Sequence, residues 1–195
     1  MDKILIEVSA KHIHLSKEDK DILFGKDYPL HPLRELTQKG QFVSEETLEI
    51  QLDNKKISDI RVVFPDRNQT KIELSLTDIV HLGVRQGLNI GEPIKGTEQA
   101  ILLGPMGKLR LLKGLIVYQR HIHISPEKAK ELNLTEKSIV AVKFEGKREL
   151  VFHNIKIRIE KGAVFSLHID TDEGNAAGIT RTGEGILLRH NENNI

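Results

Sequence analysis

A short motif that contains two histidines occurs twice in this chain, and the sequence around each copy is alike. Residues 12–16 read His-Ile-His-Leu-Ser and residues 121–125 read His-Ile-His-Ile-Ser, an offset of 121 − 12 = 109 residues. Each copy follows a short β-prone run, and each serine can cap a helix, with Pro126 at the first helical position after the second copy. This repeat predicts two related halves, each with a strand that leads into a short helix.

Most of the remaining sequence is typical of short strands separated by turn signals. Few helices are indicated, which favours barrels or sandwiches over a wound α/β sheet. The turn sequence Gly-Pro-Met-Gly at residues 104–107 is the best boundary candidate. We therefore expect a mainly β fold with short α-helices, with one domain over residues 1–104, a second over residues 105–190 and a polar tail at 191–195. The expected strands after the first motif are 47–52, 59–64, 70–75, 115–118, 138–144, 149–152, 155–159 and 163–169.

Composition limits both the partners and the metal ligands that are available. Twenty-nine basic and 28 acidic residues give a formal net charge of +1, so no global field attracts nucleic acid or a membrane surface, and we expect neither as a partner. The chain has no cysteine and nine histidines, so a metal site must use imidazole and oxygen ligands. Without an evident leader or long apolar span, a cytoplasmic location is expected. A homo-oligomer remains compatible with the sequence.

The histidine pairs are the first candidates for metal binding. Alternate side chains of a strand share a face, so His12 and His14 point the same way, as do His121 and His123. One such pair is as easily the polar face of a strand, but two pairs in matching contexts favour chelation. Because catalytic zinc sites usually have three protein ligands and one open position, each pair requires about one further ligand.

Two residues elsewhere in the chain can complete these pairs. Glu73 lies on an alternating strand, and His168 lies among apolar residues where an unpartnered imidazole would be costly. From spacing alone, a structural role is favoured over metal binding for both residues: Glu73 as an exposed strand carboxylate and His168 as a hydrogen-bonded core histidine. The sequence pattern by itself leaves both alternatives open.

Four segments of the chain closely resemble one protein family. They are residues 8–16, 67–78, 120–126 and 167–177, and they include Arg-Asn-Gln-Thr-Lys-Ile-Glu at 67–73 and His-Ile-Asp-Thr-Asp-Glu-Gly-Asn at 168–175. In order and spacing they resemble the PduL-type phosphate propanoyltransferases. The resemblance implies two related β-barrel domains capped by short helices, with the active site and two zinc ions between them. It also implies a phosphotransacylase that moves a propanoyl or acetyl group between coenzyme A and inorganic phosphate.

The resemblance supplies the grouping that spacing leaves open. One zinc ion would be held by His12, His14 and Glu73, and the other by His121, His123 and His168. Arg67 matches the active-site arginine of the family and would face the phosphate, as a planar fork of donors suits this anion. The residues that the resemblance places at coenzyme A are Ser9, Arg34, Arg61, Val63, His168 and Asn175.

The chain also departs from the family pattern. Phe64-Pro65-Asp66 precedes Arg67 where the family usually has Gly-Pro, and Lys11 stands where an arginine is common. The N-terminal extension that directs some members to bacterial microcompartments is not seen. Two alternatives stay open: a zinc-dependent hydrolase, and a non-catalytic, zinc-stabilised binding protein. Cobalt, nickel or iron can also occupy histidine-rich sites, so zinc is expected from ligand type.

Overall fold

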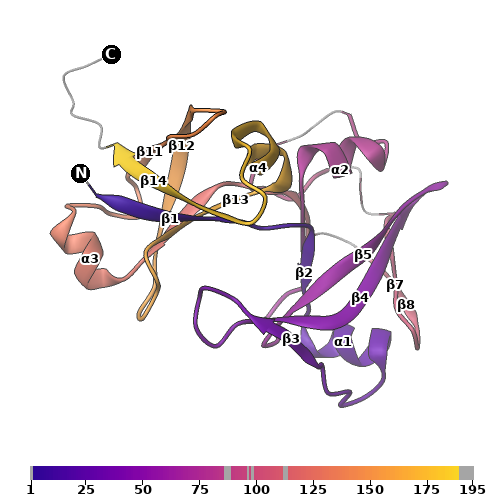
Figure 1. Cartoon of the computed structure of the whole chain (residues 1–195). Coiled ribbons are helices and arrows are strands. Elements are labelled where there is room, and N and C mark those ends of the chain that lie inside the picture. The colour runs from indigo at the N-terminus through magenta and orange to yellow at the C-terminus, as the bar shows by residue number, and fades with distance from the viewer. Residues whose placement is uncertain (1, 86–88, 96, 98, 112–113, 189–195) are drawn as a thin grey trace. The chain divides into compact units, whose positions relative to one another are not determined.

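The structure is a computed structural model that describes residues 2–85, 89–95, 97, 99–111 and 114–188 (Figure 1). The expected polar tail at 191–195 lies outside the described residues. The chain divides into two compact units. Unit 1 comprises residues 1–9, 37–39 and 119–195, and unit 2 comprises residues 10–36 and 40–118. Among the described residues, no helix has the length and apolar character needed to cross a membrane.

Unit 1 is built round a closed barrel of six strands. Two neighbouring pairs, β1 with β13 and β10 with β12, are parallel, whereas the other pairings that the register defines are antiparallel. The barrel order is β1 (Lys3–Val8), β13 (Ser166–Ile169), β10 (His121–Ile124), β12 (Leu150–Ile159), β11 (Ile139–Phe144) and β14 (Thr182–Leu188).

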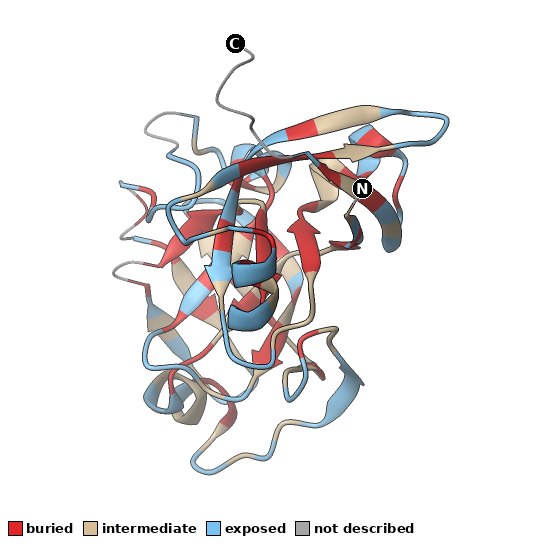
Figure 2. Cartoon of the chain, turned by 90° about the vertical axis from the view of Figure 1, so that its left-hand side faces the viewer, coloured by how far each residue is buried: buried red, intermediate tan, exposed pale blue. Residues whose placement is uncertain are grey.

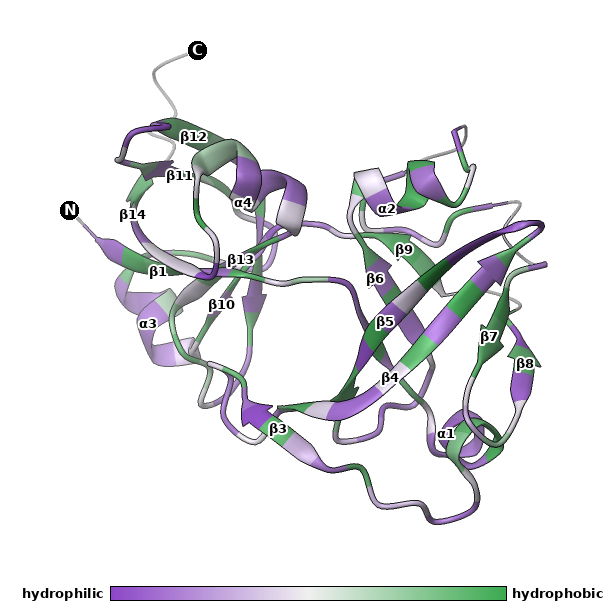
Figure 3. Ribbon diagram, turned by 45° about the vertical axis from the view of Figure 1, so that its right-hand side comes forward, coloured by the Kyte–Doolittle hydropathy of each residue, from purple (hydrophilic) through white to green (hydrophobic). Residues whose placement is uncertain are grey.

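Unit 2 contains an eight-stranded sheet. The β4–β5 hairpin is its longest pairing, and β2 lies between β5 and β6. Hydropathy alternates along β4 and β5, as expected for strands with one face in the core (Figure 3). The sheet order is β8 (Lys108–Arg110), β7 (Ile101–Leu103), β4 (Phe42–Leu52), β5 (Lys55–Phe64), β2 (His12–His14), β6 (Lys71–Leu74) and β9 (Leu115–Val117), with β3 (Pro32–Glu35) paired to β4.

Each short helix begins at a residue whose side chain accepts a hydrogen bond from the first turn. Ser16, Ser75 and Ser125 cap α1 (Lys17–Phe24), α2 (Leu76–His81) and α3 (Pro126–Glu131). Asp170 caps α4 (Thr171–Ala177), and the Glu173 side chain returns a bond to the cap backbone. Such caps satisfy backbone N–H groups that have no partner within the helix. The prediction of a mainly β fold with short helices is confirmed.

Each unit has its own hydrophobic core. In unit 1, Ile4, Ile6, Ile122 and Leu167 lie inside the barrel. In unit 2, the core is formed by alternate residues of β4, β5 and β6 together with Leu23 of α1. Buried residues, red in Figure 2, are concentrated on the strands. Along β1, β10 and β13, the side chains that alternate with these core residues therefore lie on the outer face of the barrel.

The first strand of the chain, β1, pairs with strands from the end of the chain. β1 bonds to β13 and β14 in unit 1, whereas β9, which precedes the second histidine motif, bonds to β6 in unit 2. The compact units therefore do not follow the chain order of domains at 1–104 and 105–190. β12 joins the two strands expected at 149–152 and 155–159, and Asn154 within it has a positive φ of 55°.

Candidate functional site

The predicted metal ligands occupy equivalent places in the two units. His14 and Glu73 each lie two residues before the serine that caps the next helix, at Ser16 and Ser75. In unit 1, His123 and His168 each lie two residues before the caps Ser125 and Asp170. Each ligand-bearing strand therefore leads into a capped helix.

Strand register strengthens this equivalence. Across β2 and β6, the antiparallel partner of His12 is Glu73. Across β10 and β13, the antiparallel partner of His121 is His168. Directly opposite residues share a face of the sheet, so Glu73 and His168 each stand beside the histidine pair of their own unit. The repeat therefore extends to the third predicted ligand, although the residue type differs.

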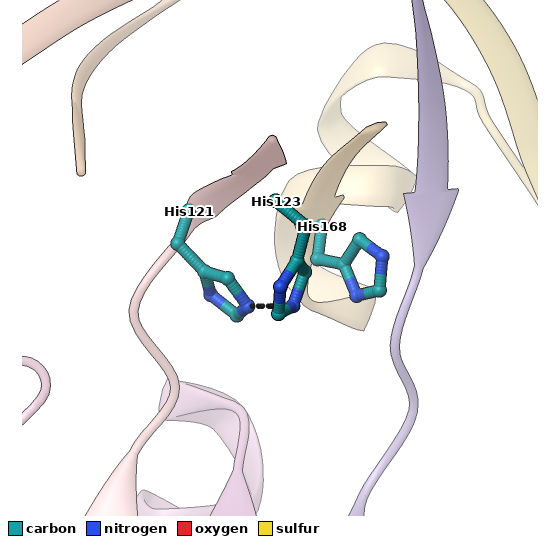
Figure 4. A group of neighbouring side chains, drawn as sticks. All are labelled: His121, His123 and His168. Carbon is teal, nitrogen blue, oxygen red and sulfur yellow. Dashed lines mark hydrogen bonds between the residues drawn. The ribbon is translucent and has the colours of Figure 1, made fainter. Parts of the chain in front are cut away.

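Three histidines of unit 1 form a compact cluster on the outer face of the barrel (Figure 4). Within the described part of the chain, they are the one group of potential metal ligands whose donor atoms all lie within 4.8 Å of one another. The rings of His121 and His123 are 4.7 Å apart between centroids, and those of His123 and His168 are 4.8 Å apart. All three side chains are buried. The prediction that His121, His123 and His168 come together is consistent with this geometry.

The hydrogen bonds of the cluster favour a cation. His121 Nδ1 lies 2.8 Å from the Gln119 carbonyl oxygen and His123 Nδ1 lies 3.1 Å from Glu160 Oε2. Both partners accept, so each Nδ1 carries the proton and each Nε2 carries a lone pair. These two Nε2 atoms are only 3.0 Å apart. Burial, with a contribution from Arg158, holds the pKa of His121 well below its usual range. A divalent metal would relieve the repulsion between these lone pairs, so the residues fit such an ion.

The ligand set predicted in unit 2 is looser. His12 Nδ1 lies 2.8 Å from the Ala10 carbonyl oxygen, and His12 Nε2 lies 3.6 Å from Glu73 Oε2. The rings of His12 and His14 meet edge to face, with centroids 5.3 Å apart. His14 Nδ1 is buried and meets no hydrogen-bond partner among the described residues. Burial, with the charges of His12 and Arg67, lowers the pKa of His14 to about 3, so its imidazole is neutral and can act as a ligand.

Arg67 is exposed and belongs to unit 2. Its backbone N–H donates to the Leu15 carbonyl oxygen at 2.8 Å, which fixes the chain beside the end of β2. The guanidinium donates to Gln41 Oε1 at 3.0 Å and contributes to the lowered pKa of His14. The neighbouring Asp66, part of the departure from the family pattern, forms an ion pair with Lys20 at 2.6 Å. Asp66 is therefore engaged by a cation other than Arg67.

Three of the residues predicted to contact coenzyme A lie in register with the unit 2 ligands. Arg61 is the register partner of His12, and Val63 is the partner of His14. Val63 in turn pairs with Val43 of β4, and Val43 pairs with Arg34 of β3. Partners in register share a face, so Arg34, Arg61 and Val63 lie on the face that bears the histidines. Ser9, after β1, and Asn175, on α4, belong to unit 1.

The acidic segment after His168 forms the helix α4. Asp170 accepts the backbone N–H of Glu173 at 2.8 Å, and Glu173 Oε2 accepts the backbone N–H of Asp170 at 3.1 Å. The carboxylate of Asp170 is thus used for capping. Sequence reasoning missed Glu160, the acceptor at His123, and Glu7, which lies beside His168. The one available signal for Glu7 was a charged residue within an apolar strand.

Glu173 should make stability depend on pH. Burial, together with Asp170 and Asp172, raises its pKa to about 7, although Arg120 lies 2.9 Å away and opposes this shift. The folded state therefore keeps this proton to a higher pH than the unfolded chain, and the free energy of unfolding falls as pH rises from about 4.5 to about 7. Glu173→Gln keeps the capping box and should flatten this part of the pH dependence.

Urea unfolding of metal-free protein, repeated across this pH window, measures the change. Glu184→Gln serves as the matched control, since Glu184 is an exposed glutamate of the same unit and pairs with Lys3 on the surface. An equal slope in the Glu173→Gln variant and the parent chain would contradict the prediction.

Comparison with known proteins identifies the family. The family model of phosphate propanoyltransferase matches residues 5–180. The chain belongs to the phosphate propanoyltransferase family. A phosphate propanoyltransferase of Thermotoga maritima is 40% identical over 186 residues, which cover 95% of this chain and 88% of that protein. Those of Sebaldella termitidis and Salmonella typhimurium are each 39% identical, over 96% and 90% of this chain and 89% and 83% of their own lengths.

The match covers both units of the chain. Its range, residues 5–180, contains both histidine motifs, Glu73, Arg67 and His168. The assignment of the sequence to the phosphate propanoyltransferase family, and with it the expectation of a transferase, is confirmed.

Proposed function

We propose that this chain transfers an acyl group between coenzyme A and inorganic phosphate, with a propanoyl or acetyl group as the substrate. In the forward direction, a phosphate oxygen forms a bond to the thioester carbonyl carbon, and the carbon–sulfur bond breaks. The products are an acyl phosphate and the free thiol of coenzyme A. The match to phosphate propanoyltransferases along residues 5–180 carries this proposal.

The two histidine sets are the proposed holders of two zinc ions. His12, His14 and Glu73 would hold one ion, and His121, His123 and His168 the other. The strand register supports this grouping, since Glu73 and His168 stand opposite equivalent histidines. Neutral imidazoles and a carboxylate, without any thiolate, are ligands that suit zinc. When bound, zinc supplies positive charge for phosphate oxygens and Lewis acidity toward a carbonyl.

Arg67 is the proposed phosphate-binding residue. Its guanidinium offers donors in a fixed planar fork that matches two phosphate oxygens. Its backbone bond to Leu15 anchors it next to the strand of His12 and His14, and its present side-chain partner is the neutral Gln41. A phosphate dianion would attract the guanidinium more strongly than this amide does. Arg67 would then orient the nucleophile and offset the charge on it.

Coenzyme A is the proposed second substrate. Arg34 and Arg61 offer positive charge for its phosphate groups, and the buried Val63 offers an apolar contact, all on the face that bears His12 and His14. Ser9, His168 and Asn175 stay predicted contacts on the strength of the resemblance. A reaction of this kind uses phosphate itself as the nucleophile, so no nucleophilic side chain is required.

The test follows thiol release from propanoyl- or acetyl-coenzyme A by zinc-loaded protein, with and without phosphate. We expect release that requires phosphate, an acyl phosphate that hydroxylamine traps as a hydroxamate, and loss of both with a metal chelator. Zinc added back in excess of chelator should restore the rate. Release that ignores phosphate would instead indicate a thioester hydrolase, and absence of release with either substrate would contradict the proposal.

A further inference from the structure

A buried glutamate accompanies the histidine cluster of unit 1. Ile4 and Ile6 of β1 point into the barrel, whereas Glu7 lies on the outer face, the face that carries the cluster. Only 6% of Glu7 is exposed, and its Oε2 lies 3.5 Å from His168 Nε2. A buried carboxylate is costly unless donors or positive charge compensate it. Its position beside His168, a predicted metal ligand, therefore calls for an explanation.

The internal repeat shows what stands at this position in the other unit. Adding the offset of 109 to residue 7 gives residue 116, which is Ile116 of β9. β1 runs parallel to β13 with Glu7 opposite His168, and β9 runs parallel to β6 with Ile116 opposite Glu73. Both residues are buried. Glu7 and Ile116 therefore occupy the same place relative to the third predicted ligand of their unit.

Each unit thus has a carboxylate at one of these two positions, but the position differs between the units. In unit 2 the carboxylate is the predicted ligand Glu73, and the neighbouring position is the apolar Ile116. In unit 1 the predicted ligand is the neutral His168, and the neighbouring position carries Glu7. Each ligand set together with this neighbour therefore contains one acid.

The hydrogen bonds at His168 indicate how Glu7 acts. His168 Nε2 lies 3.1 Å from Ser166 Oγ, which also accepts from Gln38 Nε2 at 3.0 Å and lies 3.4 Å from the Val164 carbonyl oxygen. The Ser166 hydroxyl has one proton and can donate it in a hydrogen bond to the Val164 carbonyl oxygen. Its Oγ is then an acceptor toward His168. Both neighbours of Nε2 then accept. This favours the tautomer with the proton on Nε2, and Figure 4 shows the other ring nitrogen turned toward His123.

We propose that Glu7 is a positioning residue of the second metal centre. Its carboxylate attracts the Nε2–H of His168, holds the ring so that Nδ1 faces His121 and His123, and lowers the net charge of the loaded centre by one. This role rests on the proposed metal site at these histidines. Carboxylates that engage the outer nitrogen of a metal-binding histidine commonly lower the dissociation constant of the metal by about 10- to 100-fold.

Metal affinity tests the role of Glu7 without reliance on activity. In a His14→Ala background, which disables the first centre, metal-free protein is titrated with Zn²⁺ against a chromophoric chelator, and with Co²⁺ by visible absorption. Glu7→Gln keeps the shape and removes the charge, and Glu7→Ile installs the residue type of the equivalent position. Both should weaken Zn²⁺ binding by about 10- to 100-fold and alter the Co²⁺ spectrum. Glu184→Gln, on the surface of the same unit, should do neither.

Thermal unfolding separates this role from a structural one. The metal-free Glu7 variants should unfold at or above the temperature of the metal-free parent, since a buried acid beside an imidazole has been removed. The stabilisation that Zn²⁺ adds should be smaller than in the parent. A dissociation constant for Zn²⁺ unchanged by both variants would overturn the role of Glu7. A parent protein that takes up no metal at His121, His123 and His168 would refute the metal centre as well.

Discussion

Arg67→Ala should lower the rate of phosphate-dependent acyl transfer by at least about 100-fold, a loss of the size expected when a hydrogen-bond donor aimed at the reacting group is removed. The guanidinium would otherwise bind and orient the attacking phosphate. Because Arg67 is exposed and is no predicted metal ligand, zinc content should stay that of the parent protein. Steady-state rates over a range of phosphate concentrations, together with elemental analysis of bound zinc, measure both parts of the prediction.

Two further variants sharpen the result for Arg67. Arg67→Lys keeps the charge and loses the planar fork, so it should recover only part of the rate. Arg110→Ala removes an exposed arginine on β8 of the same unit and should leave the rate unchanged. A normal rate in Arg67→Ala, or a loss of zinc from it, would contradict the proposed contact with phosphate.

His123→Ala should remove the metal of the second centre and with it the activity. Two imidazoles remain after this substitution, fewer than the three protein ligands usual for a catalytic zinc site. We expect bound zinc to fall by about one ion per chain and acyl transfer to fall by at least about 100-fold. Elemental analysis after dialysis and the thiol-release assay provide the two measurements.

An exposed histidine of the same unit offers the matched control. His153 lies on β12 with its side chain at the surface, so His153→Ala should keep both the zinc and the rate. Circular dichroism should show that both variants retain their β structure. If His123→Ala bound as much zinc as the parent, with comparable affinity, the cluster of His121, His123 and His168 would not be a metal centre.

Local sequence patterns predicted much of the fold. The repeated motif placed two strands ahead of capped helices, and both Ser16 and Ser125 cap helices as expected. This works because alternation and N-capping depend on residues only a few positions apart. For the same reason the pairs His12 with His14 and His121 with His123 were evident, whereas the third ligand of each set came from family resemblance.

The tertiary structure decided what depends on residues distant in sequence. Register across β2 and β6, and across β10 and β13, set Glu73 and His168 beside their histidines, and no local pattern specifies such pairing. Glu7 meets His168 only because β1 pairs with a strand more than 150 residues later in the chain. The sequence by itself therefore determined many of the strands, the two helices after the histidine motifs and the paired histidines. Strand pairing decided the neighbours of these histidines, since hydrogen-bonded sheets join distant segments whose contacts form only in the folded chain.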